Sequence, residues 1–150
     1  MKIETLAWHY TVGNHFLKIM ESGYLRPTDI GIEPGEKPIL WFSTNQTWDQ
    51  TACKAVLKDG KICRISKEET RNLGGGLYRF GMPIDRLHMW PKLVRKARMT
   101  PNVQRLLEIE GRKQGANPSE WCGLTSNPIA IDKIFAIQTE ADGLWVDIHR

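Results

Sequence analysis

The chain has 150 residues, of which 41% are hydrophobic and 25% are charged. These values are typical of one globular domain, taken here as residues 1–150, and they exclude a disordered chain. No apolar run approaches the ~18 residues that span a bilayer, and the N-terminus lacks the apolar segment of a signal peptide, so we expect a cytoplasmic protein. The net charge of +4 permits a polyanionic partner without requiring one.

The first third of the chain predicts alternating strands and short helices. Residues 3–10 alternate as a strand does, and Gly23 is a typical helix end, which predicts a helix over residues 15–22 capped by Asn14. Residues 26–38 are rich in Pro and Gly and predict a loop. The next predicted elements are an apolar strand over 39–43 and a helix over 46–57, capped by Ser43, Thr44 or Asn45.

The rest of the chain continues this mixture. Residues 67–76 predict a flexible turn or loop, Pro91 marks a helix start, and Thr100 can cap a helix over 101–115. Further strands are predicted over 61–66, 77–81, 119–124, 131–138 and 144–150, with a turn at 141–143. Because the order contains no regular βαβ crossovers, the predicted fold class is α+β, a mainly antiparallel sheet with inserted helices.

A basic helical insert is expected at about residues 83–115. Its basic residues outnumber its acids, and a solvated helix face is the usual explanation for such an excess. A nucleic-acid contact is the alternative, and it would use Lys92, Arg95, Lys96, Arg98 and Arg105.

Several common motifs are absent. The glycine run at residues 74–76 has no following Lys-Ser/Thr pair, so it does not predict a phosphate loop. The four histidines lack the pairwise spacing of metal ligands, and the three cysteines include no CxxC, so no metal site is expected. No GxSxG elbow is present.

Three separated segments carry the functional prediction. They are WHYT at residues 8–11, the strand and following segment at 39–52, and SEWCGL at 119–124, which is followed by IDKIFAIQ. In this order they resemble the ADP-ribosyltransferase superfamily, most closely the branch of diphtheria toxin and the poly(ADP-ribose) polymerases, whose signature is His, Tyr and Glu on three strands. The bacterial toxins that modify DNA bases are also similar. The resemblance covers most of the chain and implies the split antiparallel sheet of that family.

The resemblance implies that NAD is the co-substrate. His9 would hydrogen-bond a ribose of NAD, and Thr11 would lie near the family's small or hydroxyl residue two places on. Trp41 stands where the family has a tyrosine that stacks on nicotinamide, and any aromatic ring offers a face for stacking. Glu120 would be the catalytic acid, with Glu140 as a second candidate.

The same resemblance assigns supporting roles to four other side chains. Ser43 and Thr44 lie where related proteins place hydroxyls that brace the site. Arg79 or Arg26 would meet the pyrophosphate, because a guanidinium matches its geometry. Breaking the bond between nicotinamide and ribose creates a cation like that of glycoside hydrolysis, and a carboxylate stabilises such a charge.

The predicted function is therefore NAD-dependent mono-ADP-ribosyl transfer to a macromolecular acceptor, either nucleic acid or protein. A related alternative is an NAD-using RNA 2′-phosphotransferase, which requires basic residues around a phosphate. Two non-enzymatic alternatives stay open: a nucleic-acid binding module on the same fold, and an interaction domain that exposes several of the six tryptophans to a protein partner.

Overall fold

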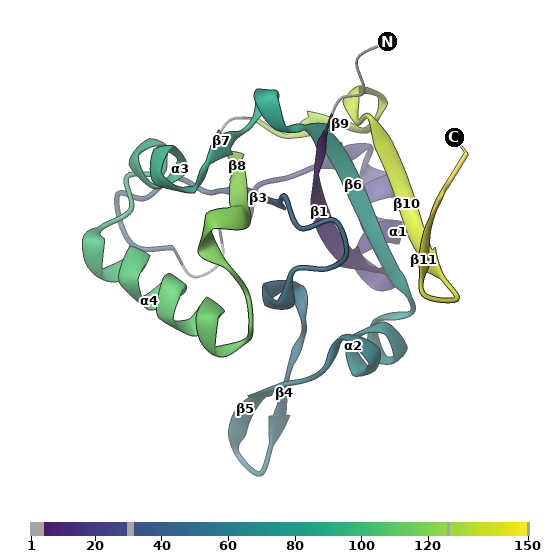
Figure 1. Ribbon diagram of the computed structural model, residues 1–150, viewed down its shortest axis with the longest axis horizontal. Helices are drawn as coiled ribbons and strands as arrows, with labels where there is room; N and C mark the ends of the chain where they lie inside the picture. Colours follow the sequence, from purple (N-terminus) through teal and green to yellow (C-terminus); the bar gives the residue numbers. More distant parts are fainter. Residues whose placement is uncertain (1–4, 30–31, 126, 150) are drawn as a thin grey trace.

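A seven-stranded antiparallel sheet organises the chain (Figure 1). The computed structural model describes residues 5–29, 32–125 and 127–149. From one edge to the other, the sheet consists of β11 (Leu144–Asp147), β10 (Ala136–Ala141), β6 (Leu77–Pro83), β1 (Leu6–Val12), β3 (Leu40–Ser43), β8 (Trp121–Leu124) and β7 (His88–Met89). Two small sheets pair β2 (Tyr24–Leu25) with β9 (Ile129–Ala130), and β4 (Ala55–Lys58) with β5 (Lys61–Arg64).

In the part of the chain that the structure describes, four α-helices accompany the sheet: α1 (Gly13–Ser22), α2 (Lys67–Gly74), α3 (Trp90–Lys96) and α4 (Pro101–Lys113). Figure 1 shows α1 behind β1 and β6, whereas α3 and α4 lie beside β7 and β8. The predicted α+β class is confirmed at this level, and α3 and α4 fall in the expected basic insert. No helix in the described ranges is long and apolar enough to cross a membrane.

The centre of the sheet contains a seam between β1 and β3. Strand β1 pairs with β6 from Leu6 to Val12, whereas its register with β3 is the single pair Trp8↔Ser43. On its other side β3 pairs with β8 over its whole length. The seam therefore separates two well-paired parts of the sheet. Two of the segments singled out in the sequence contain its strands β1 and β3, and the third contains β8, the next strand beyond β3.

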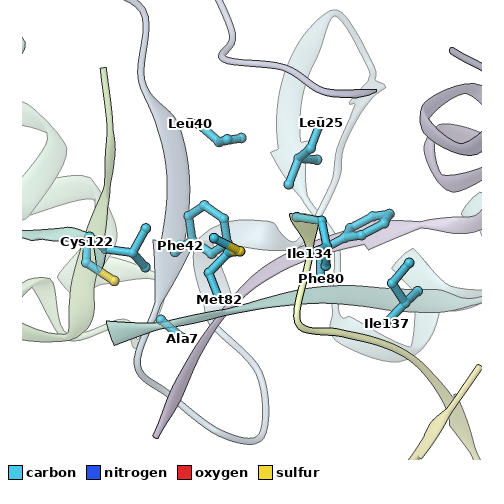
Figure 2. Close-up of a cluster of buried hydrophobic side chains, with 10 residues drawn as sticks. Ala7, Leu25, Leu40, Phe42, Phe80, Met82, Cys122, Ile134 and Ile137 are labelled. Atoms are coloured by element: carbon cyan, nitrogen blue, oxygen red, sulfur yellow. The ribbon is translucent and has the colours of Figure 1, made fainter. Parts of the chain in front are cut away.

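One face of the sheet carries a core of aliphatic and phenylalanine side chains (Figure 2). Side chains alternate across a strand, so Ala7, Phe42 and Phe80 share this face, and Phe16 and Ile19 of α1 pack against it. Each large apolar side chain buried here stabilises the fold by roughly 1.5–3 kcal/mol. This core holds the central strands against α1.

The opposite face is aromatic. Trp8 and Tyr10 of β1 pack with Trp48, and Trp90 of α3 packs with Trp121 of β8. The ring centroids of Trp90 and Trp121 lie 5.0 Å apart in an edge-to-face arrangement, which aromatic pairs favour.

Two predicted elements were wrong. The predicted helix over 46–57 is instead an irregular loop, the 3₁₀ turn Gln50–Ala52 and strand β4. The physical reason is the turn at Asp59 and Gly60, whose φ angles of 50° and 75° join β4 to β5 as a tight hairpin. The predicted loop over 67–76 is largely helix α2.

Helix α2 forms because its first turn is capped from both directions. The Ser66 side chain accepts a hydrogen bond from the Glu69 backbone, and the Glu69 carboxylate accepts one from the Ser66 backbone. Elsewhere Thr100 caps α4 and Gly23 ends α1 in a left-handed conformation, as predicted. Asn14 is not a cap, because α1 begins at Gly13 and the N-cap position is Val12.

Candidate functional site

An aromatic cavity of about 360 Å³ lies on the aromatic face of the sheet, a volume within the range of small-molecule sites. Its ring-bearing walls are Trp8, Tyr10, Trp41 and Trp121, with His9 and Phe42 at the seam. Its polar residues are Ser43, Asp49, Thr51, Arg64, Glu110 and Gln114. We call this space the aromatic cavity.

A second space of about 410 Å³, the basic cavity, lies between β1, α1 and the segment that follows α1. It is lined by His9, Thr11, His15, Lys18, Ile19, Ser22, Tyr24, Leu25, Arg26 and Thr28. No acidic residue is among these described lining residues. His9 is among the lining residues of both cavities. Its ring packs near Phe42 and Phe80, on the side of the sheet that faces α1.

His9 bridges the seam with its side chain. Its Nδ1 lies 2.7 Å from the carbonyl oxygen of Trp41. Because a carbonyl only accepts, Nδ1 carries the hydrogen and donates it. Burial lowers the pKa of His9 from 6.5 despite this hydrogen bond, and the charge of His15 lowers it further. Neutral His9 therefore presents Nε2 as an acceptor, and no hydrogen bond from a described residue reaches that atom.

The residues predicted from the sequence are divided between the two cavities. Trp41 and Ser43 line the aromatic cavity with His9, whereas Thr11 lines the basic cavity. Trp41 is half-buried, and its ring centroid lies 5.7 Å from that of Trp90. Neighbouring rings thus hold Trp41 at the cavity wall.

Glu120 lies next to the aromatic cavity but is not one of its described lining residues. It ends the 3₁₀ turn Pro118–Glu120 just before β8, and its backbone oxygen accepts hydrogen bonds from the N–H and hydroxyl of Thr44. Its carboxylate accepts a 3.4 Å hydrogen bond from the Asn45 side chain. Thr44 and Asn45 therefore fix the position of Glu120. The second candidate acid, Glu140, is held by Lys67 and Arg71.

Arg79 is buried in a cage of aromatic rings. Its guanidinium carbon lies 3.8 Å from the ring centroid of Trp8 and 4.4 Å from that of Trp145. It donates hydrogen bonds to the Gln138 side chain and the Gln46 carbonyl. These contacts use the guanidinium to hold the loop after β3, and Arg79 lines neither cavity.

Tyr10 and Trp145 fix the same loop. Burial raises the pKa of Tyr10 to about 12, so its hydroxyl stays neutral and donates to the Asn45 carbonyl. The Trp145 ring nitrogen donates to the Thr47 carbonyl at 2.9 Å. The loop that contacts Glu120 is therefore tied to the sheet from several sides.

Asp49 is a buried cavity residue that sequence reasoning missed. Its side chain accepts hydrogen bonds from the Thr51 backbone at 3.0 Å and from the Thr51 hydroxyl at 2.6 Å. The signal was available, since an Asp two residues before a Thr commonly caps a turn. Because a helix was predicted over 46–57, the turn that Asp49 caps was not predicted.

Gly111 lets α4 approach the aromatic cavity closely. A Cβ atom at this position would lie 2.5 Å from Cζ2 of Trp121. Only glycine fits at this distance, and α4 thereby places Glu110 and Gln114 in the cavity lining.

The cations proposed for nucleic-acid contact are all exposed on or near α3 and α4: Lys92, Arg95, Lys96, Arg98 and Arg105. None of the six tryptophans is exposed, because four are buried and Trp41 and Trp145 are half-buried. This burial counts against an interaction domain whose partner contacts exposed tryptophans.

Within the described residues no cluster of three or more His, Cys, Asp or Glu side chains could hold a metal ion. Compared with known proteins, the chain matches no family model, and neither a curated protein nor a solved structure is significantly similar to it. The functional argument therefore depends on the geometry described above.

Proposed function

We propose that the chain is an NAD-dependent ADP-ribosyltransferase that modifies a macromolecular acceptor. The observation that carries this proposal is the position of His9, which is one of the lining residues of both the aromatic cavity and the basic cavity. A dinucleotide offers matching chemistry, because it joins a flat heterocycle to phosphates through ribose hydroxyls. Nε2 of neutral His9 is an acceptor suited to such a hydroxyl.

The aromatic cavity supports the nicotinamide end of the proposal. Trp41 is positioned as a wall on which a heterocycle can stack, and Ser43 supplies a hydroxyl on the same strand. In this proposal the two side chains bind and orient the leaving group, which promotes the reaction by positioning. Thr44 acts through its hydrogen bonds to Glu120, and Thr11 faces the other end of the dinucleotide.

Glu120 is the proposed catalytic acid. As the bond between nicotinamide and ribose breaks, its electron pair leaves with nicotinamide and positive charge develops on the sugar. A carboxylate held nearby by Asn45 stabilises that charge. The nucleophile then comes from the acceptor and forms the new bond at the same sugar carbon.

NAD binding is the direct test. Titration calorimetry should detect NAD binding to the wild-type protein, with affinity weakened about tenfold or more in His9→Ala, because a buried hydrogen-bond partner is lost. His149→Ala is the matched control, since His149 is exposed. The proposal fails if the folded protein does not bind millimolar NAD, or if His9→Ala binds it as tightly as the wild type.

The basic cavity also favours a second candidate, an NAD-using RNA 2′-phosphotransferase, because it provides the cluster of basic residues that this reaction needs. The two candidates differ in their product. Loss of a 2′-phosphate from an RNA oligonucleotide in the presence of NAD would select the phosphotransferase, whereas a persistent ADP-ribosyl adduct on the acceptor would select the transferase.

A further inference from the structure

The basic cavity is lined by basic side chains and by no described acidic residue that would balance their charge. His15 and Lys18 reach it from α1, and Arg26 reaches it from the segment after β2. Within the described chain, none of the three forms an ion pair. Lys18 and Arg26 are exposed to solvent, so an anion placed between them would be attracted by both charges.

Hydroxyl groups line the same cavity, among them those of Thr11 and Ser22. That of Ser22 already donates to the Ile19 carbonyl at 3.0 Å, so of these two Thr11 is the hydroxyl that can donate to an anion. Thr11 lines it from β1 and Ser22 from the end of α1. The guanidinium of Arg26 lies 5.3 Å from the ring centroid of Tyr24. This cation–π contact restricts the conformations of the Arg26 side chain. Guanidinium, ammonium and hydroxyl donors together are the groups that bind phosphate oxygens.

The electrostatics of the two histidines support this interpretation. Burial lowers the pKa of His15, and the charges of Lys54 and Lys18 lower it further. The charge of His15 contributes in turn to the lowered pKa of His9. Burial is the larger cause of both shifts, and the smaller contributions of the neighbouring cations have the sign that a positive potential gives.

We infer that the basic cavity is a phosphate-binding site in which Lys18 and Arg26 supply the principal charges. This inference deepens the proposed function and rests on it for the source of the phosphate. It also selects between the two arginines considered for a pyrophosphate: Arg26 lines the cavity, whereas Arg79 is enclosed by Trp8 and Trp145. The phosphate belongs either to the dinucleotide or to the acceptor.

Inorganic pyrophosphate is the probe for the site itself. Its binding is measured by heteronuclear NMR titration of the wild-type protein and of the double variant Lys18→Gln/Arg26→Gln. The double variant should bind pyrophosphate at least about tenfold more weakly than the wild type, because two charge-assisted contacts are lost. The matched control is Lys58→Gln/Lys61→Gln on the exposed β4–β5 hairpin, which removes the same charge elsewhere and should leave binding unchanged.

The site is overturned if the wild type does not bind pyrophosphate, if the double variant binds it equally well, or if the hairpin control loses as much affinity. Protein folding is checked by the dispersion of the same NMR spectra. Because pyrophosphate binding requires no NAD, a protein that binds pyrophosphate but not NAD would retain this site while losing the proposed function.

NAD and nicotinamide riboside, which lacks phosphate, then identify the source. If the phosphate belongs to the dinucleotide, the double variant should weaken NAD binding about tenfold and leave nicotinamide riboside binding unchanged. If NAD binding is also unchanged while pyrophosphate binding is lost, the phosphate belongs to the acceptor. Both results support a phosphate site.

Discussion

The aromatic cavity and the basic cavity share His9 but draw their other walls from different kinds of residue. The first is built mainly from ring-bearing residues of the sheet, such as Trp8 and Trp121, which are buried and fixed by neighbouring rings. The second takes its charges from exposed side chains of α1 and the following segment, such as Lys18 and Arg26. Buried rings therefore determine the shape of the aromatic cavity, whereas exposed cations determine the charge of the basic cavity.

This difference has an energetic meaning. Buried aromatic walls keep their positions whether or not a ligand is bound, so they favour selection by fit. Exposed cations attract an anion before it makes contact, but at physiological ionic strength salt largely screens this attraction beyond about 8–10 Å. A ligand that spans both cavities would be attracted by charge and then selected by shape.

The largest expected effect lies beside the aromatic cavity. Glu120→Gln should reduce nicotinamide release about 100-fold or more, because the lost interaction belongs to the developing charge of the transition state. NAD affinity, measured by calorimetry, should change little. Nicotinamide release is followed by liquid chromatography with purified protein and candidate acceptors.

Asp49→Asn is the comparison for this result, because Asp49 is the buried carboxylate that lines the aromatic cavity. Each variant is first shown to be folded by its unfolding midpoint. Undiminished release in Glu120→Gln, together with loss in Asp49→Asn, would transfer the acidic role to Asp49.

The next effect concerns the rigidity of the aromatic side. Arg79→Met should lower the free energy of unfolding by about 3 kcal/mol, because it leaves buried acceptors unpaired and removes cation–π contacts. Urea unfolding followed by tryptophan fluorescence measures the change. Arg105→Met, at an exposed position of α4, should change stability by less than about 0.5 kcal/mol. Equal stability of the two variants would contradict the described role of Arg79.

The smallest expected effect is the dependence of the free energy of unfolding on pH. The pKa values of His9 and His15 are lowered from 6.5 in the folded protein. The unfolded chain therefore binds more protons below this pH, and the free energy of unfolding should fall as pH decreases from about 7.5 to about 5.5. Both histidines are neutral above this window, where they contribute nothing to the pH dependence.

The His9 part of this pH dependence is isolated by substitution. Urea midpoints of the wild type and of His9→Gln are compared at the two pH values. The variant should show a shallower decrease, since one of the groups that must become charged is gone. An identical decrease in both proteins would show that His9 does not have the lowered pKa.

The elements best predicted from the sequence are those with a strong local signal. Gly23 ends α1, Thr100 begins α4, and the turn at 141–143 joins β10 to β11. The possible caps before residue 46 favour a helix over 46–57, whereas the Asp-Gly pair at 59–60, which the helix prediction did not take into account, is a hairpin signal. The capping pair Ser66 and Glu69 was readable in the sequence, and it was overlooked because the following glycines suggested a flexible loop.

The candidate site was only partly predictable. Residues on one strand, such as Trp41 and Ser43, could be placed together because side chains alternate with period two. The separation of Thr11 from Trp41 depends on the register Trp8↔Ser43 between β1 and β3, which puts the two side chains on opposite faces of the sheet and which no local pattern specifies. The enclosure of Arg79 likewise depends on Trp145, which lies 66 positions farther along the chain. No local sequence pattern predicts this contact.

Gly111 has a consequence for how proteins of this shape can evolve. A glycine inside a helix costs about 1 kcal/mol relative to alanine, and here it lets α4 rest against Trp121. Any larger residue would push α4 outward, which would widen the aromatic cavity and carry Glu110 and Gln114 with the helix. The size of accepted ligands can therefore drift through one small residue without any change in the reacting groups.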